Sequence, residues 1–142
     1  MRRRLLLDTN VIVSGLFFPG RERKLLGLIT GGTAILILPE SVLIECLEIA
    51  KRKFAGESNV SDSLLGALVE GAEIMRLDQY SDGVADAKKM IRDEKDAPIL
   101  AAALQSKPDF LISGDTDFLV LRGKFDFKIV SPKEFFDANP DF

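Results

Sequence analysis

Short and mostly apolar runs recur along this chain, and segments with helical patterns separate them. Strands that are apolar on both faces are typical of a parallel sheet that helices cover on both sides. Such runs predict strands at residues 5–7, 34–38, 73–77, 110–113 and 127–130. The sequence therefore predicts an α/β fold, a three-layer α/β/α sandwich with a mostly parallel sheet of about five strands.

The segments between these runs predict helices, and some of their ends are recognisable. Gly31 and Gly32 suit the end of the second helix, and Ser131 followed by Pro132 suits the start of the last one. We predict helices from about residue 11, at 22–30, 39–54, 63–71, 85–91 and 98–105, and from 132, with a loop at 56–62. No repeat, low-complexity tract or linker divides the chain, so we expect one domain over residues 1–142.

The chain contains no histidine and one cysteine, Cys46, and this limits its chemistry. The lack of histidine excludes Ser–His and Cys–His catalysis and most zinc sites. A single cysteine excludes an internal disulfide framework and is typical of a reducing compartment. Asp8 interrupts the apolar run after Arg2 to Arg4, which argues against a signal peptide. Gly31-Gly32 splits the longer apolar stretch at residues 25–38, which argues against a membrane-spanning helix. We therefore expect a cytoplasmic protein with no membrane association, whose chemistry uses carboxylates, lysines or hydroxyls.

Two of the predicted strands end in carboxylates. Asp8 follows the first strand in the motif DTN, and Asp115 follows the fourth strand in the motif SGDTD. The carboxyl ends of parallel strands meet at one edge of the sheet, where open α/β proteins bind ligands. A buried charge is costly unless an opposite charge shares its site, so the pair indicates a basic side chain, backbone N–H groups or a metal ion. The alternative is that each carboxylate simply caps the helix or turn that follows it.

Two further acids occupy positions that a ligand site could use. Glu45 lies beside an apolar stripe of the helix predicted at 39–54, so it is either an edge residue that reaches solvent or a ligand. Asp96 directly precedes a helix that is apolar nearly all round; it suits an N-cap, but a buried helix start also places a carboxylate near the sheet edge. The neighbouring Asp93 and Glu94 are alternatives to Asp96 for this role, although solvated positions suit them better. The main core stripe of the helix at 39–54 is predicted to be Leu43, Leu47, Ala50 and Phe54.

Four segments, taken in order, resemble the PIN-domain family: LLLDTNVIVSGLF, ESVLIECLEIAKRKF, DAPILAAAL and FLISGDTDFLVL. The resemblance covers essentially the whole chain and is closest to VapC-like toxins of toxin–antitoxin systems. It implies that the family's acidic quartet is Asp8, Glu45, Asp96 and Asp115, with Asp117 as an accessory acid. It also matches Thr9 and Asn10 to the polar residues beside the first aspartate, and Ser113 to a position where the family often has threonine.

This set of residues predicts metal-dependent hydrolysis of RNA. Mg²⁺ and Mn²⁺ prefer carboxylate oxygens, and one or two such ions can orient a phosphodiester and activate a water. We expect Asp8 and Asp115 to be the central ligands, and Glu45 and Asp96 to complete the shell or orient water. The roles that remain are assigned to Asp117 as a further ligand and to Thr9, Asn10 and Ser113 as hydrogen-bonding residues around the ligands.

The net charge of −3 means that any attraction to RNA must be local. Candidate basic clusters are Arg2 to Arg4, Arg21, Arg23 and Lys24, Lys51 to Lys53, and Lys88 and Lys89. For any one of them, a set of solvated helix ends is the simpler interpretation. The resemblance further implies a cognate antitoxin protein and self-association, most simply as a homodimer. The alternatives are a non-cleaving RNA- or partner-binding PIN module, an aspartyl-phosphate phosphatase and a receiver-type phospho-acceptor. Asn10 disfavours the phosphatase, because that chemistry usually has a second aspartate in a D-x-D motif.

Overall fold

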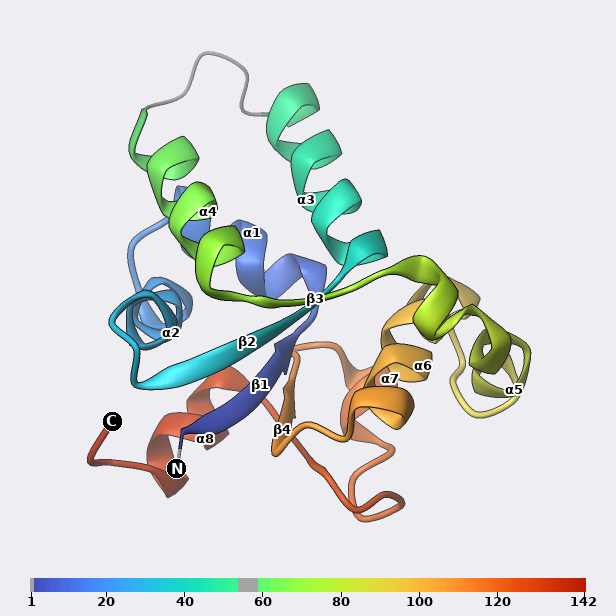
Figure 1. Cartoon of the computed structure of the whole chain (residues 1–142). Coiled ribbons are helices and arrows are strands. Elements are labelled where there is room, and N and C mark those ends of the chain that lie inside the picture. Colours follow the sequence, from blue (N-terminus) through green and yellow to red (C-terminus); the bar gives the residue numbers. More distant parts are fainter. Residues whose placement is uncertain (1, 54–58) are drawn as a thin grey trace.

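The computed structural model describes residues 2–53 and 59–142, and its centre is one parallel sheet (Figure 1). The five strands lie in the order β3-β2-β1-β4-β5, and every neighbouring pair is parallel. The prediction of an α/β sandwich with about five strands is therefore confirmed. The strands are β1 (Arg3–Leu7), β2 (Ala34–Pro39), β3 (Glu73–Met75), β4 (Phe110–Ile112) and β5 (Lys128–Val130).

Helices connect the strands and cover both faces of the sheet. α1, α2 and α4 contact one another on one face, and α5 packs with α6 on the other (Figure 1). Short 3-10 turns occur at Leu77–Gln79, Ser81–Gly83 and Glu94–Asp96. The α-helices are α1 (Thr9–Phe17), α2 (Arg21–Thr30), α3 (Glu40–Lys53), α4 (Asn59–Gly71), α5 (Val84–Lys88), α6 (Ala97–Ser106), α7 (Thr116–Leu119) and α8 (Pro132–Ala138).

The strand order reverses between β1 and β4, and this reversal positions the candidate site. From β1 the chain proceeds to β2 and β3 on one side, whereas β4 and β5 extend the sheet on the other side of β1. Because parallel crossovers are right-handed, this change of direction moves the connecting helices from one face of the sheet to the other. The helices diverge above the carboxyl ends of β1 and β4, and ligands bind at such a point in open α/β sheets.

The core is made by apolar strands and by the helices packed on them. Leu5, Leu6 and Leu7 of β1 are fully buried, as expected for the central strand of a sheet that is covered on both faces. In β4, Phe110 packs edge-on against Phe135 of α8, with ring centroids 5.2 Å apart. No helix among residues 2–53 and 59–142 is both long enough and apolar enough to cross a membrane.

Several predicted boundaries differ from the structure. β3 ends at Met75, two residues earlier than predicted, because Leu77 begins a 3-10 turn. α1 begins at Thr9 rather than near Val11, because the Asp8 side chain caps the helix. The predicted loop at 56–62 is partly helical, since α4 begins at Asn59; its residues 56–58 lie outside the described part of the chain.

The prediction of the core stripe of α3 is wrong at Leu47. The face packed inward carries Val42 and Cys46, which are buried, whereas Leu47 is 50% exposed. α3 contacts α1 through this inward face, and a helix with two apolar stripes does not specify locally which stripe will meet a partner. Phe54, the last member of the predicted stripe, lies outside the described residues.

Candidate metal site

An acidic cleft of about 190 Å³ lies at the carboxyl ends of β1 and β4. It brings together acids from the end of β1, from α3, from the segment before α6 and from the segment after β4, although almost the whole chain separates the first from the last. All four acids of the predicted quartet contribute to its wall. The lining residues are Asp8, Thr9, Asn10, Glu45, Asp93, Lys95, Asp96, Ile99 and Asp115.

Asp8 is the most buried acid of the cleft, with 5% of its surface exposed. Its Oδ1 accepts a hydrogen bond from the backbone N–H of Val11 at 2.9 Å. Asp8 therefore caps α1, as the alternative interpretation of this residue predicted. Its Oδ2 accepts a hydrogen bond from the hydroxyl of Ser113. Burial raises the pKa of Asp8 despite these two hydrogen bonds, and the charges of Asp115 and Glu45 raise it further.

Ser113 links the two strand-end acids. It is fully buried after β4, and its hydroxyl donates to Asp8 while accepting the backbone N–H of Asp115 at 3.0 Å. Asp115 in turn caps α7, since its Oδ1 accepts the backbone N–H of Asp117 at 2.8 Å. Both strand-end acids therefore cap helices and also face a common cleft, so the two interpretations of these residues are compatible.

Asp96 behaves differently, because it does not cap the helix that it precedes. It occupies the N-cap position of α6, yet its side chain makes no capping hydrogen bond there. Its Oδ2 is buried and has no hydrogen-bond partner. Burial raises the pKa of Asp96 to about 7, and the charges of Asp115, Asp93 and Asp8 add to this effect. The capping interpretation of Asp96 is therefore not supported, and an unpaired buried carboxylate oxygen needs another explanation.

Glu45 is exposed and lies on the α3 wall of the cleft. Its charge is close enough to Asp8 to raise the pKa of that carboxyl group. It also raises the pKa of the buried Cys46 thiol, which burial and the acids together bring to about 12. Glu45 thus both reaches solvent and faces the other acids, so the two sequence-based possibilities for this residue do not exclude each other.

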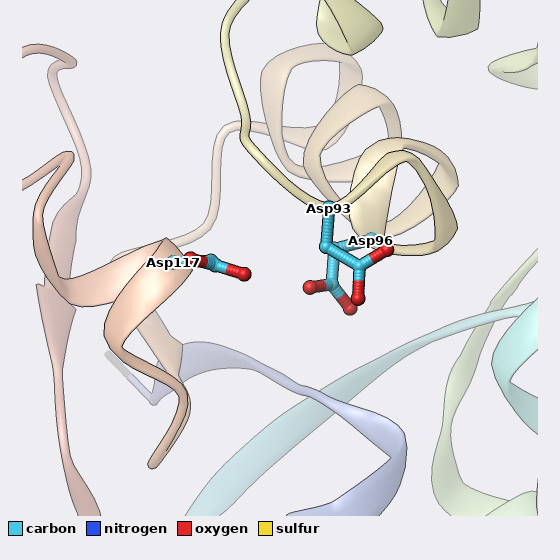
Figure 2. Close-up of side chains that lie close together, drawn as sticks. All are labelled: Asp93, Asp96 and Asp117. Atoms are coloured by element: carbon cyan, nitrogen blue, oxygen red, sulfur yellow. The ribbon is translucent and has the colours of Figure 1, made fainter.

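One close group of carboxylates includes Asp93, which the sequence interpretation kept as an alternative to Asp96 but favoured as a solvated residue. Oxygen atoms of Asp93, Asp96 and Asp117 lie within 4.8 Å of one another. Asp93 and Asp96 lie side by side before α6, and Asp117 of α7 points towards them (Figure 2). Asp93 is exposed to solvent, but it also lines the cleft. The signal that was available is the spacing of three residues from Asp96, which places both side chains on one side of a helical turn.

The two polar residues beside Asp8 lie in different surroundings. Thr9 is 3% exposed, and its hydroxyl oxygen is buried without a hydrogen-bond partner. Asn10 is exposed on the wall of the cleft. The acids of the cleft, Thr9 and Asn10 offer oxygen ligands, which fit a hard cation such as Mg²⁺ or Mn²⁺ better than zinc.

Two of the four predicted basic clusters have structural partners elsewhere. Arg4 pairs with Glu73 at 2.9 Å and donates to the Ser106 carbonyl at the amino end of the sheet. Arg23 donates to the carbonyl oxygens at the end of α1. The cation that lines the acidic cleft is Lys95, which was not among the predicted clusters.

Solved structures of low sequence identity share this fold. One is a toxin–antitoxin complex from Klebsiella pneumoniae, 18% identical, with a TM-score of 0.66 over 90% of this chain and 97% of the other. Another is FitAcB from Neisseria gonorrhoeae, 23% identical, with a TM-score of 0.63 over 91% and 98%. A third is VapC20 of Mycobacterium tuberculosis, described as a sarcin-ricin loop cleaving toxin, 12% identical, with a TM-score of 0.56 over 82% and 93%.

No curated protein matches the chain at the level of sequence. A family model does match: the model of the PIN domain covers residues 4–117, from the start of β1 to Asp117. This range contains every acid of the cleft described above. The chain therefore belongs to the PIN-domain family.

Proposed function

We propose that this protein is a divalent-metal-dependent endoribonuclease and the toxin of a toxin–antitoxin pair. The observation that carries the proposal is the convergence of acids from four separate segments on one cleft, where one of them, Asp96, has a buried and unpaired carboxylate oxygen. Independent helix caps would not require such a convergence. Membership of the PIN-domain family supports nuclease chemistry, and the toxins among the solved structures with this fold favour the toxin role.

The residues of the cleft suit Mg²⁺ or Mn²⁺. Asp8 and Asp115 would hold the ion, while Glu45, Asp96 and Asp117 would complete the ligand set or orient water. Bound there, such an ion would offset charge on a phosphodiester and lower the pKa of an attacking water. The Ser113 hydroxyl, placed between Asp8 and the backbone of Asp115, would keep these two acids in position, and Thr9 and Asn10 would bond to bound water or substrate.

RNA has to approach an acidic cleft, and Lys95 is suited to contact it there. Lys95 is exposed and lines the cleft among the acids. Once a cation offsets part of the negative charge, the ammonium group can bind a phosphate near the scissile bond. The clusters at Arg4 and Arg23 are less suitable, because their guanidinium groups already bond to the protein.

The direct test is cleavage of a panel of structured and single-stranded RNAs by purified protein with Mn²⁺. Wild type should cleave, chelator should abolish cleavage, and Asp8→Asn should reduce it to background. Asp126→Asn is the matched control, because Asp126 is an exposed acid at the opposite edge of the sheet, and it should cleave like wild type. Intact RNA throughout the panel, with wild type loaded with Mn²⁺, would contradict the nuclease proposal; RNA binding without cleavage would favour the non-cleaving module.

The toxin role has its own test. Expression of wild type should arrest growth, and expression of Asp8→Asn should not. A protein encoded next to this one should restore growth and form a stable complex with the wild-type protein. We expect the wild-type protein itself to be a homodimer. Harmless expression in several hosts would remove the toxin role but leave the nuclease proposal standing. A phosphoprotein intermediate trapped with a phosphoryl donor would instead favour a phosphatase or a receiver module.

A further inference from the structure

We propose that a groove beside the acidic cleft binds one base of the RNA substrate, and that Glu48 makes this groove selective for guanine. The groove has a volume of about 240 Å³ and lies between α3 and the 3-10 turn Leu77–Gln79. This role rests on the proposed function, because it concerns the base that such a nuclease reads next to the bond that it cleaves. The lining residues are Glu40, Ser41, Ile44, Glu45, Glu48 and Leu77.

The groove adjoins the candidate metal site through Glu45, which lines both. Ser41, Ile44 and Glu48 follow one another at spacings of three and four residues along α3, so they share one face of the helix with Glu45. Glu48 lies about 4.5 Å farther along the helix axis than Glu45, since each residue adds about 1.5 Å. Successive nucleotides of a stacked strand are about 3.4 Å apart. A base next to the scissile phosphate is therefore within reach of the groove when that phosphate lies at the metal site.

The groove has apolar walls that solvent reaches. Ile44 of α3 and Leu77 of the 3-10 turn both line it, and 47% and 49% of their surfaces are exposed. Nucleobases taken up by proteins stack on aromatic or apolar side chains of this kind. The volume of about 240 Å³ equals the share of about eight molecules in liquid water, at about 30 Å³ each. This space suits one flat ring system rather than a folded protein segment.

The charge of the groove favours a base over a phosphate. Glu40, Glu45 and Glu48 line it, and no lysine or arginine of the described residues does, so a phosphate would be repelled. In the same part of the chain, these three carboxylates are not close enough to one another to form a cation site. The group that fits is neutral, flat and rich in N–H donors. The bases are the parts of RNA with this chemistry.

A buried tyrosine positions a hydrogen-bond donor on one wall of the groove. The hydroxyl of Tyr80, a residue that is 2% exposed, donates to Ser41 Oγ at 2.9 Å and accepts the backbone N–H of Ser41 at 3.0 Å. Ser41 Oγ therefore acts as an acceptor towards Tyr80, and its own hydrogen has no acceptor among the described residues. Because Ser41 lines the groove, its hydroxyl can donate to a ligand there.

Glu48 provides the complementary acceptor. Its carboxylate makes no hydrogen bond or ion pair within residues 2–53 and 59–142, whereas Glu40 already accepts the backbone N–H of Leu77 at 3.4 Å. A free carboxylate accepts two parallel N–H bonds. Guanine presents two adjacent N–H donors, N1–H and the 2-amino group, beside the acceptor O6, and a single strand leaves this edge accessible. Glu48 would accept both donors while the Ser41 hydroxyl donates to O6.

The first experiment tests the groove without requiring cleavage. Guanosine, inosine and adenosine are titrated into the protein, and the methyl signals of Ile44 and Leu77 are followed by nuclear magnetic resonance. Guanosine should shift both signals and bind about tenfold or more tightly than inosine, which lacks the 2-amino group. Glu48→Gln should remove this difference. Glu70→Gln changes an exposed acid of α4 that lines neither the groove nor the cleft, and this matched control should behave like wild type.

The second experiment measures the base preference of cleavage. An RNA that wild type cleaves is remade with guanine, inosine, adenine, cytosine or uracil on either side of the cleaved bond. At one of these positions, kcat/KM for guanine should exceed that for every other base by about tenfold or more. Glu48→Gln should reduce this ratio to about one, whereas Glu70→Gln should retain it.

The outcomes separate this role from the proposed function. Guanosine binding that depends on Glu48, in a protein that cleaves no RNA, would support the groove and contradict the nuclease. Cleavage without a base preference, or with a preference that Glu48→Gln retains, would overturn the groove and leave the nuclease standing. Equal binding of guanosine and inosine would overturn the role of Glu48. If guanosine leaves the two methyl signals unchanged while a protein encoded next to this one shifts them, the groove binds a protein partner and the base-binding role is overturned.

Discussion

A single carboxylate, Asp8, both caps α1 and lies in the acidic cleft. Its capping bond to Val11 stabilises the start of the helix, whereas burial and the nearby charges of Asp115 and Glu45 make its ionised form costly. The two effects oppose each other in the metal-free protein. Substitutions that keep the cap but remove the charge therefore have a different effect on stability from those that remove both.

We expect Asp8→Asn to melt at the same temperature as metal-free wild type or higher, because the buried charge is lost and the amide oxygen keeps the cap. Asp8→Ala loses the cap as well and should be less stable than Asp8→Asn by about 1 kcal/mol. Denaturant unfolding in metal-free buffer measures both. Mn²⁺ at about a hundred times its Kd should stabilise wild type by about 2.7 kcal/mol and Asp8→Asn much less. A metal-free Asp8→Asn protein that melts clearly below wild type, with no Mn²⁺ shift in wild type, would favour the caps-only interpretation.

Lys95 gives a second prediction at this scale. Lys95→Gln should raise the KM for RNA more than it lowers kcat. It should also reduce the slope of the logarithm of RNA affinity against the logarithm of salt concentration by about 1, the value for one lost phosphate contact. Mn²⁺ should bind the variant as tightly as wild type or more tightly, because a positive charge has left the cleft. Lys128→Gln, a change at an exposed lysine at the amino end of β5, is the control and should leave KM, kcat, the salt dependence and the affinity for Mn²⁺ unchanged. Equal effects of the two variants would show that Lys95 contributes only net charge.

At the scale of elements, the close packing of α1 against α2 fixes the position of the helix that Asp8 caps. Gly15 of α1 makes this approach possible. A Cβ at this position would lie 2.6 Å from a methyl carbon of Leu26 and 2.9 Å from the carbonyl oxygen of Glu22. The second of these is backbone, so the helices would have to move apart.

Gly15→Ala should therefore destabilise the protein by about 1–3 kcal/mol, as overpacking usually does. The matched control is Gly27→Ala in α2, where an added Cβ would meet open space. Alanine is the better helix former there, so this variant should gain up to about 1 kcal/mol. Urea unfolding of the pair measures both changes. The packing argument fails if the two substitutions change the free energy of unfolding by the same amount.

At the scale of the whole molecule, the cleft links the stability of the fold to pH. Burial raises the pKa of Asp96 from 3.8 to about 7 and raises that of Asp8 as well. Between the unfolded and folded pKa values, the folded chain binds protons that the unfolded chain has released. The free energy of unfolding therefore falls as the pH rises through this window.

Metal-free wild type should accordingly melt at a lower temperature above a pH of about 7 than near a pH of about 5. Asp96→Asn should flatten this dependence, because the variant has one group fewer that takes up a proton on folding. Mn²⁺ should restore the stability of wild type at the higher pH, since deprotonated carboxylates bind the ion. Melting curves across the window in metal-free buffers measure the effect. A wild-type stability that rises steadily with pH would contradict the assignment of raised pKa values.

The sequence by itself determined the α/β class, the parallel sheet and the presence of acids after β1 and β4. These features depend on local signals: apolar runs of strand length, turn residues, and motifs at strand ends. It placed Asp96 before α6 correctly but did not decide between a cap and a ligand, because both roles suit the same local pattern. The missing capping bond of Asp96 is visible only in three dimensions.

Only the tertiary structure decided which residues meet. Sheet pairing of β1 with β4 brings Asp8 next to Asp115, and the tertiary fold brings Asp93, in the segment before α6, close to Asp117 of α7. The inward face of α3, the partners of Arg4 and Arg23, and the position of Lys95 in the cleft depend in the same way on neighbours far along the chain. Periodicity specifies which side of an element is apolar, but the distance between side chains on different elements is fixed only when those elements pack together.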